Sequence, residues 1–486
     1  MKQPLALTAA WLLAATLNLH AQGSLTPPPG APAPVMKTLD QIEARTPVNS
    51  TTCPGDATAT YIIIAPGSYY LTNSIGGNPG KVGIRVEAVN VTIDLNGFNL
   101  QAAAGATKGI YVTSSGGPIV IRNGFMRFWT EPAIYIPNAS EFTIQDVTIT
   151  NVTGRGIDVA GSGTIERVNI KYAVDYGIFF NVASGGIVRD CRVENITGTT
   201  VARGIYAPKA LITGCTVTGI TGSSSGASNT VAGISCAGGN VNRCLVQTVT
   251  QQGGGTASGV DQAASVSHTA VSQIISSAAS STNGIAGISA CDEVSSCSIS
   301  AVSTASHYCY GVSGAGNVVS CNVKDITSTS GSSVGISGNS IRDCTVKNMP
   351  NGTGLECTIA SKSLIDDCAS GIHLSDGGSA TGNTVKNAKG SGIQPNGNNI
   401  QIIGNNLEGT GVAGSYGISY NTLFQYIRIE GNHVSGWGTG LNIPVPNALV
   451  VRNSAGGNTV NFTLHASMPV VTGAALGTNP NANVGF

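Results

Sequence analysis

The stretch that decides the fold is residues 177–203, GIFFNVASGGIVRDCRVENITGTTVAR. It opens with Gly-Ile, passes through small polar residues and two further apolar runs, and closes in a Gly/Thr-rich turn. The same phrase begins again at Gly204. With the opening Gly as a marker, copies begin at positions 83, 109, 156, 177, 204, 233, 259, 287, 311, 335, 354, 371, 392, 417 and 440, and one further copy has Ala133 instead. Sixteen copies indicate a stack of units, none of which buries its apolar face alone.

Each copy contains short apolar runs that alternate with polar residues and are rich in Val, Ile and Thr. This period of two is typical of strands, and no copy has the longer 3.6-residue pattern that a helix needs. A unit of about 23 residues is too short for a four-stranded propeller blade, but it accommodates three strands and three turns. The pattern therefore predicts an all-β fold, a single-stranded parallel β-helix of about sixteen coils over residues 83–464.

One register of the unit holds small or amide side chains. It is occupied by Cys in the middle of the chain, at Cys191, Cys215, Cys244, Cys297, Cys321, Cys344 and Cys368. Val147 and Val168 precede this series, and Asn383, Asn405 and Asn432 follow it. We interpret the register as an inward ladder, because buried Asn can hydrogen-bond to its equivalents in neighbouring coils.

Twelve Cys in a secreted chain would normally indicate a disulfide framework. The shared register instead favours buried, reduced thiols that act as small apolar groups. Cys53, Cys291 and Cys309 lie off the ladder, so a bridge among them stays open.

The segments outside the repeat have their own composition. Residues 1–21 have the basic start, apolar run and small residues of a secretory signal peptide, with a membrane anchor as the alternative. We expect a Pro-rich linker at 22–36, an N-terminal cap at 37–82 and a C-terminal tail at 465–486 that caps the far end or is disordered.

The net charge is zero and only 10% of residues are charged, so neither nucleic acid nor an anionic membrane is attracted. After the first residues, no stretch is apolar enough to span a membrane. We expect a secreted protein in an extracellular, periplasmic or cell-surface location.

Few residues suggest chemistry. Asp366 and Asp367 form the one acid pair near a histidine, His373, and paired carboxylates can hydrolyse glycosides. The Arg-Asp pairs at 189–190 and 342–343 occupy positions that look equivalent to Asp366–Asp367. We therefore interpret Asp366 and Asp367 as polar groups of turns. The spacing of His, Cys and acidic residues predicts no metal site, and we expect no cofactor.

An outward row offers a better candidate site. In the first strand of each coil, the residue after Gly-Ile should point outward, because the residues on either side of it face the core. Near the N-terminus this row reads Tyr111, Tyr135, Asp158, Phe179 and Tyr206; it continues as Ser235, Asp261, Ser289, Ser313, Ser337, Glu356, His373, Gln394, Ser419 and Asn442. Four aromatic residues over five coils would form a strip about 20 Å long. Their flat faces suit stacking on sugar rings. The alternative is that strands simply favour Tyr and Phe, or that an N-terminal turn covers them.

The repeat resembles the pectate-lyase-like superfamily of right-handed parallel β-helix proteins over about residues 60–460. Within it, the chain resembles secreted bacterial proteins of planctomycete and verrucomicrobial type, on the segments MKTLDQIEARTPV (36–48), APGSYYLTNSI (65–75), VTIDLNGFNL (91–100) and NPNANVGF (479–486). The superfamily contains lyases, hydrolases and epimerases of acidic polysaccharides, and also adhesins and tailspikes. The resemblance implies a right-handed coil and a polysaccharide partner. Because the superfamily's Asn-Thr-Asp, Gly-Asp-Asp, Gly-His-Gly, Arg-Ile-Lys and Asp-Pro-His signatures are absent, catalysis stays open.

Two classes of function therefore remain. One is a protein that interacts with extracellular polysaccharide, as a binder or as a lyase, hydrolase or epimerase. The other is a non-catalytic structural or adhesive rod of the cell surface.

Overall fold

The computed structural model describes residues 44–486, apart from 140, 183–184, 224–229, 278–283, 290, 306–307, 421–424, 469 and 473–479. Thr46–Phe486 is one compact unit. The expected signal peptide at 1–21 and the linker at 22–36 lie outside the described residues. Among the residues described there is no helix, and hence none long and apolar enough to cross a bilayer.

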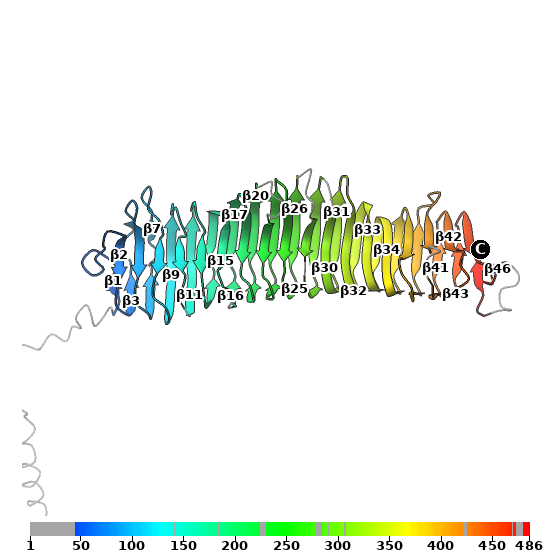
Figure 1. The fold of residues 1–486 in the computed structure, drawn as a ribbon, viewed down its shortest axis with the longest axis horizontal. Helices are drawn as coiled ribbons and strands as arrows, with labels where there is room; N and C mark the ends of the chain where they lie inside the picture. Colours follow the sequence, from blue (N-terminus) through cyan, green and yellow to red (C-terminus); the bar gives the residue numbers. More distant parts are fainter. Residues whose placement is uncertain are drawn as a thin grey trace, which may run out of the picture. The chain divides into compact units, whose positions relative to one another are not determined.

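Thr46–Phe486 is an all-β parallel solenoid of about 17 turns, which confirms the predicted fold class. A typical coil consists of β18 (Val201–Tyr206), β19 (Ala210–Thr213) and β20 (Thr216–Gly222). Each pairs in parallel with its equivalent in the next coil, β21 (Thr230–Ser235), β22 (Asn240–Asn242) and β23 (Leu245–Gln251). Figure 1 shows the coils of this unit stacked along one axis, with the chain advancing one coil at a time.

The coils build three parallel stacks of strands. The first strands are β2 (Ala59–Ile63), β5 (Val82–Val86), β8 (Ile110–Val112), β10 (Ile134–Ile136), β12 (Ile157–Val159), β15 (Tyr176–Phe180), β18, β21, β24 (Thr256–Asp261), β27 (Ile285–Ser289), β36 (Ser391–Pro395), β39 (Tyr416–Ser419), β42 (Thr439–Ile443) and β45 (Val460–Leu464). The second strands are β3 (Gly67–Tyr70), β6 (Val91–Asp94), β13 (Ser162–Glu166), β16 (Gly186–Arg189), β19, β22, β25 (Ser265–Ser267), β28 (Glu293–Ser295), β37 (Gln401–Ile403), β40 (Ile427–Glu430) and β43 (Ala448–Val451). The third strands are β4 (Ile75–Gly76), β7 (Asn99–Gln101), β14 (Asn169–Val174), β17 (Arg192–Gly198), β20, β23, β26 (Ala270–Ser276), β29 (Ser298–Thr304), β31 (Asn322–Ser328), β35 (Thr384–Ala388), β38 (Asn406–Gly409), β41 (His433–Ser435), β44 (Ser454–Gly456) and β47 (Asn483–Gly485).

Some strands continue through a corner and serve more than one stack. Two stacks are served by β9 (Pro118–Arg127), β11 (Glu141–Thr150), β30 (Cys309–Val319) and β32 (Ser333–Arg342), and all three by β33 (Thr345–Ser361) and β34 (Leu364–Thr381). The short strands β1 (Thr46–Pro47) and β46 (Val470–Thr472) pair with β3 and β47.

The marker glycines lie where the first strand comes close to the third. A Cβ added at Gly233 would be 2.2 Å from Val246 Cγ1 and 2.8 Å from the Gly259 carbonyl oxygen. Gly204 and Gly259 have the same surroundings in their own coils. Real Cβ atoms do not approach other atoms this closely, so these three coils require Gly at this register.

The inward ladder is confirmed, with one correction. The residue at this register accepts a hydrogen bond from the backbone N–H of its equivalent one coil earlier: Asn405 Oδ1 accepts from Asn383 N at 2.9 Å, and Ser363 Oγ accepts from Cys344 N at 3.2 Å. Cys368 was wrongly placed here, because it pairs with Met349 and fills an apolar position of the third strand. Ser363 holds the ladder position of that coil, where its Oγ accepts from Cys344 N and its own N–H donates to Asn383 Oδ1.

The solenoid extends beyond the marked copies at both ends. β2 and β5 pair with Ala59 opposite Val82, so the segment expected as a cap contains a coil of its own. Thr60 then holds the marker position, which explains why a search for Gly missed it. At the far end, part of the expected tail returns to the stack: Asn483 in β47 accepts from Asn453 N at 3.1 Å and completes the Asn ladder.

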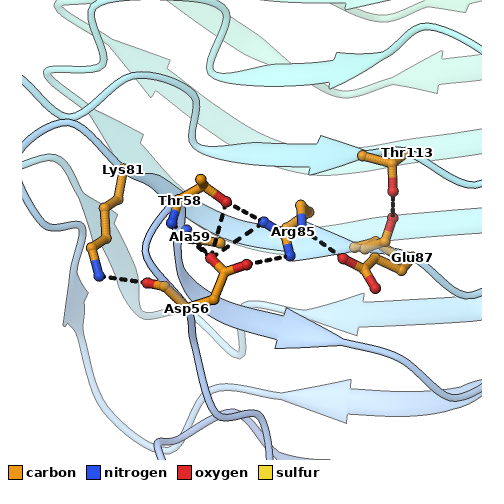
Figure 2. Close-up of polar contacts among 8 residues, drawn as sticks. Asp56, Thr58, Ala59, Lys81, Arg85, Glu87 and Thr113 are labelled. Atoms are coloured by element: carbon orange, nitrogen blue, oxygen red, sulfur yellow. Dashed lines mark hydrogen bonds and ion pairs between the residues drawn. The ribbon is translucent and has the colours of Figure 1, made fainter.

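An ion-pair network anchors the N-terminal end (Figure 2). Arg85 Nη2 lies 2.7 Å from Asp56 Oδ2, and Arg85 Nε lies 2.7 Å from Glu87 Oε1. Lys81 Nζ donates to the Asp56 carbonyl oxygen at 2.6 Å. The hydrogen bond from Arg85 holds the pKa of Asp56 well below its usual range. These contacts fasten the turn before β2 to the following coil, as an end cap requires.

All twelve cysteines are free and buried. Burial raises the pKa of Cys236, Cys291, Cys309 and Cys357 to about 12, so the reactive thiolate is scarce as well as inaccessible. We expect maleimide to label none of them in the native protein and all twelve after denaturation, as measured by intact mass. A Thr72→Cys variant, with its thiol at an exposed position, should gain one label in the native state. Native labelling of the parent, or thiols missing after denaturation, would contradict the prediction.

Candidate functional site

The structure aligns the predicted outward row. Tyr111 pairs with Tyr135, Tyr135 with Asp158, Asp158 with Phe179, and Phe179 with Tyr206. The register continues through Ser235, Asp261, Ser289 and Ser313, and again from Ser337 through Glu356 and His373 to Gln394. We call Tyr111, Tyr135, Asp158, Phe179 and Tyr206 the aromatic strip.

The rings of the aromatic strip form two stacked pairs. Tyr111 and Tyr135 have centroids 5.3 Å apart and planes at 22°; Phe179 and Tyr206 are also 5.3 Å apart, at 20°. Each pair therefore turns its inner faces toward one another, and only the outer faces and the edges can meet a ligand. The rings are half-buried rather than exposed.

Asp158 interrupts the strip and is buried, whereas the sequence pattern predicted an outward, exposed carboxylate. Its Oδ2 accepts from Arg155 Nη1 at 2.6 Å, while its buried Oδ1 has no hydrogen-bond partner. Burial raises the pKa of Asp158, and Arg155 opposes that shift. Asp158 keeps its place in the row, but its carboxylate is not exposed because Arg155 folds over it.

Cations cover the strip, and sequence reasoning missed them. Lys108 Nζ lies 5.5 Å from the ring centroids of both Tyr111 and Tyr135. Arg155 Cζ lies 4.2 Å from the Phe179 centroid, and Arg203 Cζ lies 4.8 Å from that of Tyr206. Each of the three cations stands immediately before a marker glycine, at Gly109, Gly156 and Gly204. The position before the marker was therefore the signal that could have found them.

The cations differ in their carboxylate partners. Lys108 is paired with Glu131, and Arg155 with Asp158. Arg203 donates from Nη2 to Thr230 Oγ1 at 2.9 Å, and its Nε is buried without a hydrogen-bond partner. Within the described part of the chain, no carboxylate lies within ion-pair distance of Arg203. Its positive charge is therefore the strip's least compensated one.

A cavity of about 390 Å³ lies at the interruption of the strip. It is lined by Lys108, Glu131, Tyr135, Arg155 and Asp158, among others. Of the residues described, Tyr135 is the one aromatic residue that lines it, and the turns before the first strands supply most of its other walls.

Two more cavities follow the same row toward the C-terminus. One of about 310 Å³ is lined by Asp261, Ser289 and Ser313, and one of about 710 Å³ by Ser337, Glu356 and His373. Burial raises the pKa of Asp261, although a hydrogen bond from Ser289 opposes the shift. The outward row is thus a line of depressions on one face of the solenoid.

The acid pair is separated from His373. Asp366 belongs to the third-strand part of β34, where it lies 3.8 Å from Lys347 Nζ and accepts from Asn387 Nδ2 at 2.9 Å. His373 belongs to the first-strand part and lies beside Glu356. The proposed equivalence of Asp366–Asp367 with the pair at 342–343 is wrong, because Arg342 pairs with Ser361. The contacts of Asp366 with Lys347 and Asn387 nevertheless suit a polar group on the outside of a turn. Among the described residues, no group of three His, Cys, Asp or Glu side chains could hold a metal ion.

A family model described as a right handed beta helix region matches residues 108–261, about a third of the chain. No curated protein matches the sequence. Among solved structures, the chain is similar to the Dettilon tailspike protein, with 12% identity and a TM-score of 0.27 over 65% of this chain and 60% of that one. The chain thus spans less than two thirds of the tailspike's length.

Two further solved structures show similarity at the same level. For the periplasmic alginate epimerase AlgG the identity is 11% and the TM-score 0.25, over 79% of this chain and 82% of that one. For the catalytic unit of an α-1,3-glucanase from Streptomyces thermodiastaticus the values are 14% and 0.22, over 76% and 62%. Values this low carry no conclusion about what this chain does.

Proposed function

We propose that this chain is a secreted protein that binds acidic polysaccharide at the aromatic strip. The observation that carries the proposal is the cavity beside Tyr135, which combines an aromatic ring with the cations Lys108 and Arg155. An aromatic ring offers apolar contact to the C–H face of a sugar, and nearby cations offer charge-assisted hydrogen bonds to its carboxylates.

Arg203 adds a second anchor for negative charge. Arginine presents a planar fork of donors that matches a carboxylate, and here that fork lies over Tyr206 with no carboxylate partner among the described residues. Arg85, one coil before the strip on the same row, shows the contrast, because Asp56 and Glu87 already occupy its guanidinium. A uronate-bearing chain that runs along the row can meet both the cavity and Arg203 without displacing an internal ion pair at Arg203.

We expect the double variant Tyr135→Ala/Tyr206→Ala to weaken retention on acidic polysaccharide by about tenfold or more, because each ring contributes roughly 0.5–1.5 kcal/mol of stacking. Affinity electrophoresis in gels that contain polygalacturonate, alginate or hyaluronate measures this retention. Arg203→Gln should weaken retention on these polyanions and leave behaviour on neutral dextran unchanged, since dextran has no carboxylate for the guanidinium to pair with.

The matched control is Tyr172→Ala/Tyr426→Ala, which removes two tyrosines that are exposed and lie off the row. It should be retained like the parent. If the strip variant binds like the parent, the strip is not the site; if the parent is not retained on any polyanion, the structural rod is the better account. Release of reducing ends or of unsaturated uronates from these polymers would add catalysis to binding.

A further inference from the structure

The largest cavity of the row lies over the shortest coils. Four strands there, β30, β32, β33 and β34, run through the corner between the first and second stacks without an intervening loop. Small residues occupy that corner, namely Gly314, Ala315, Gly316 and Gly338. A hollow of about 710 Å³ lies over this corner, within the usual size of ligand sites.

Two titratable side chains of the outward row line this hollow. His373 Nδ1 lies 3.9 Å from Glu356 Oε1 on the adjacent coil. His373 Nε2 is buried and has no hydrogen-bond partner, and the contact to Glu356 is longer than a hydrogen bond. Hydrogen-bonding capacity on both side chains is therefore left unused within the protein.

The polar lining is unlike that of the aromatic strip. It contains hydroxyls and amides from Ser337, Asn339, Thr358, Ser375 and Asn396, and it contains no Lys or Arg. Its acidic members are Glu356 and Asp292. A polyanion would meet carboxylates here without a compensating cation, whereas a hydroxyl-rich neutral ligand would find donors and acceptors.

Burial favours the uncharged forms of the central pair: it raises the pKa of Glu356 and lowers the pKa of His373. A neutral ligand adds no further charge to a partly buried site where burial already disfavours charge.

We propose that this hollow is a second, separate binding site, which takes a neutral sugar residue hydrogen-bonded by Glu356 and His373. The site lies on the same row as the aromatic strip but selects against the negative charge that the strip attracts. The proposal does not depend on binding at the strip.

The test is titration calorimetry of the full chain with cellohexaose, mannohexaose and xylohexaose, and with trigalacturonate and a glucosamine tetramer as charged probes. We expect at least one neutral hexasaccharide to bind. His373→Ala and Glu356→Ala should each weaken its affinity by about tenfold, which is the effect of losing one hydrogen bond to the ligand. Ser419→Ala, on the same row but outside the hollow, should bind like the parent.

A variant that fills the hollow distinguishes loss of the binding site from loss of folding. Asn339 is exposed at the edge of the hollow, so Asn339→Trp should occupy the space, abolish binding and leave the melting temperature unchanged. Tyr135→Ala/Tyr206→Ala should leave neutral-sugar binding unchanged, which separates this site from the strip. Binding by a charged probe alone, no binding of any neutral hexasaccharide, or undiminished binding by Asn339→Trp would overturn the proposal.

Discussion

Gly233→Ala is expected to destabilise the solenoid by about 3 kcal/mol or more, because the added methyl has no space. It would lie 2.2 Å from Val246 Cγ1 on the third strand and 2.8 Å from the Gly259 carbonyl oxygen of the next coil. Val246 is fully buried, so it cannot move aside without disturbing the core. Denaturation in guanidinium, followed by circular dichroism, measures the change in the free energy of unfolding.

The control is Gly404→Asn, at a glycine that is needed for a different reason. Gly404 has a φ of 64° and no atom within 4 Å of its added Cβ. Asp190 and Asp343 adopt φ values of 55° and 54° at the equivalent turn, so Asn should be accepted for less than about 1 kcal/mol. A small effect of Gly233→Ala, or equal effects of both substitutions, would show that close approach does not select Gly at the marker.

Asn405→Ala is expected to cost about 3–5 kcal/mol, since it leaves several buried polar groups unsatisfied. Asn405 Oδ1 accepts from Asn383 N at 2.9 Å and from Asn383 Nδ2 at 3.0 Å. Its Nδ2 donates to the Ala380 carbonyl oxygen at 3.0 Å and to Asn432 Oδ1 at 2.9 Å. Guanidinium denaturation measures the loss, and hydrogen exchange of the Asn383 amide locates it.

Asn405→Ser is the matched variant, because Ser363 fills the same register and accepts from the preceding coil. It should protect the Asn383 amide better than Ala does and recover part of the lost stability. If Ser and Ala at position 405 have the same effect, the ladder stabilises the fold by packing alone. A loss below about 1 kcal/mol for Ala would contradict the hydrogen-bond account altogether.

The aromatic strip shows which features strand alternation predicts and which it does not. Strand alternation predicted its register from Tyr111 to Tyr206, because the residue after Gly-Ile must face away from the core in every coil. The same pattern predicted exposed ring faces, but the rings stack on each other and lie under Lys108 and Arg155. The conformations of long side chains depend on contacts with neighbouring coils, which are more than twenty residues away along the chain.

The sequence by itself determined the coil, the marker glycines, the inward ladder and the outward row, because each coil repeats one local constraint and the repetition makes it visible. Only the tertiary structure decided that Ser363 rather than Cys368 holds the ladder position, because coil lengths differ there and register depends on pairing with the next coil. It also decided that Arg203 has no carboxylate partner in the part of the chain that the structure describes, and that a hollow forms beside Glu356 and His373. Both follow from which side chains of successive coils meet in space, and no periodicity within a single coil carries that information.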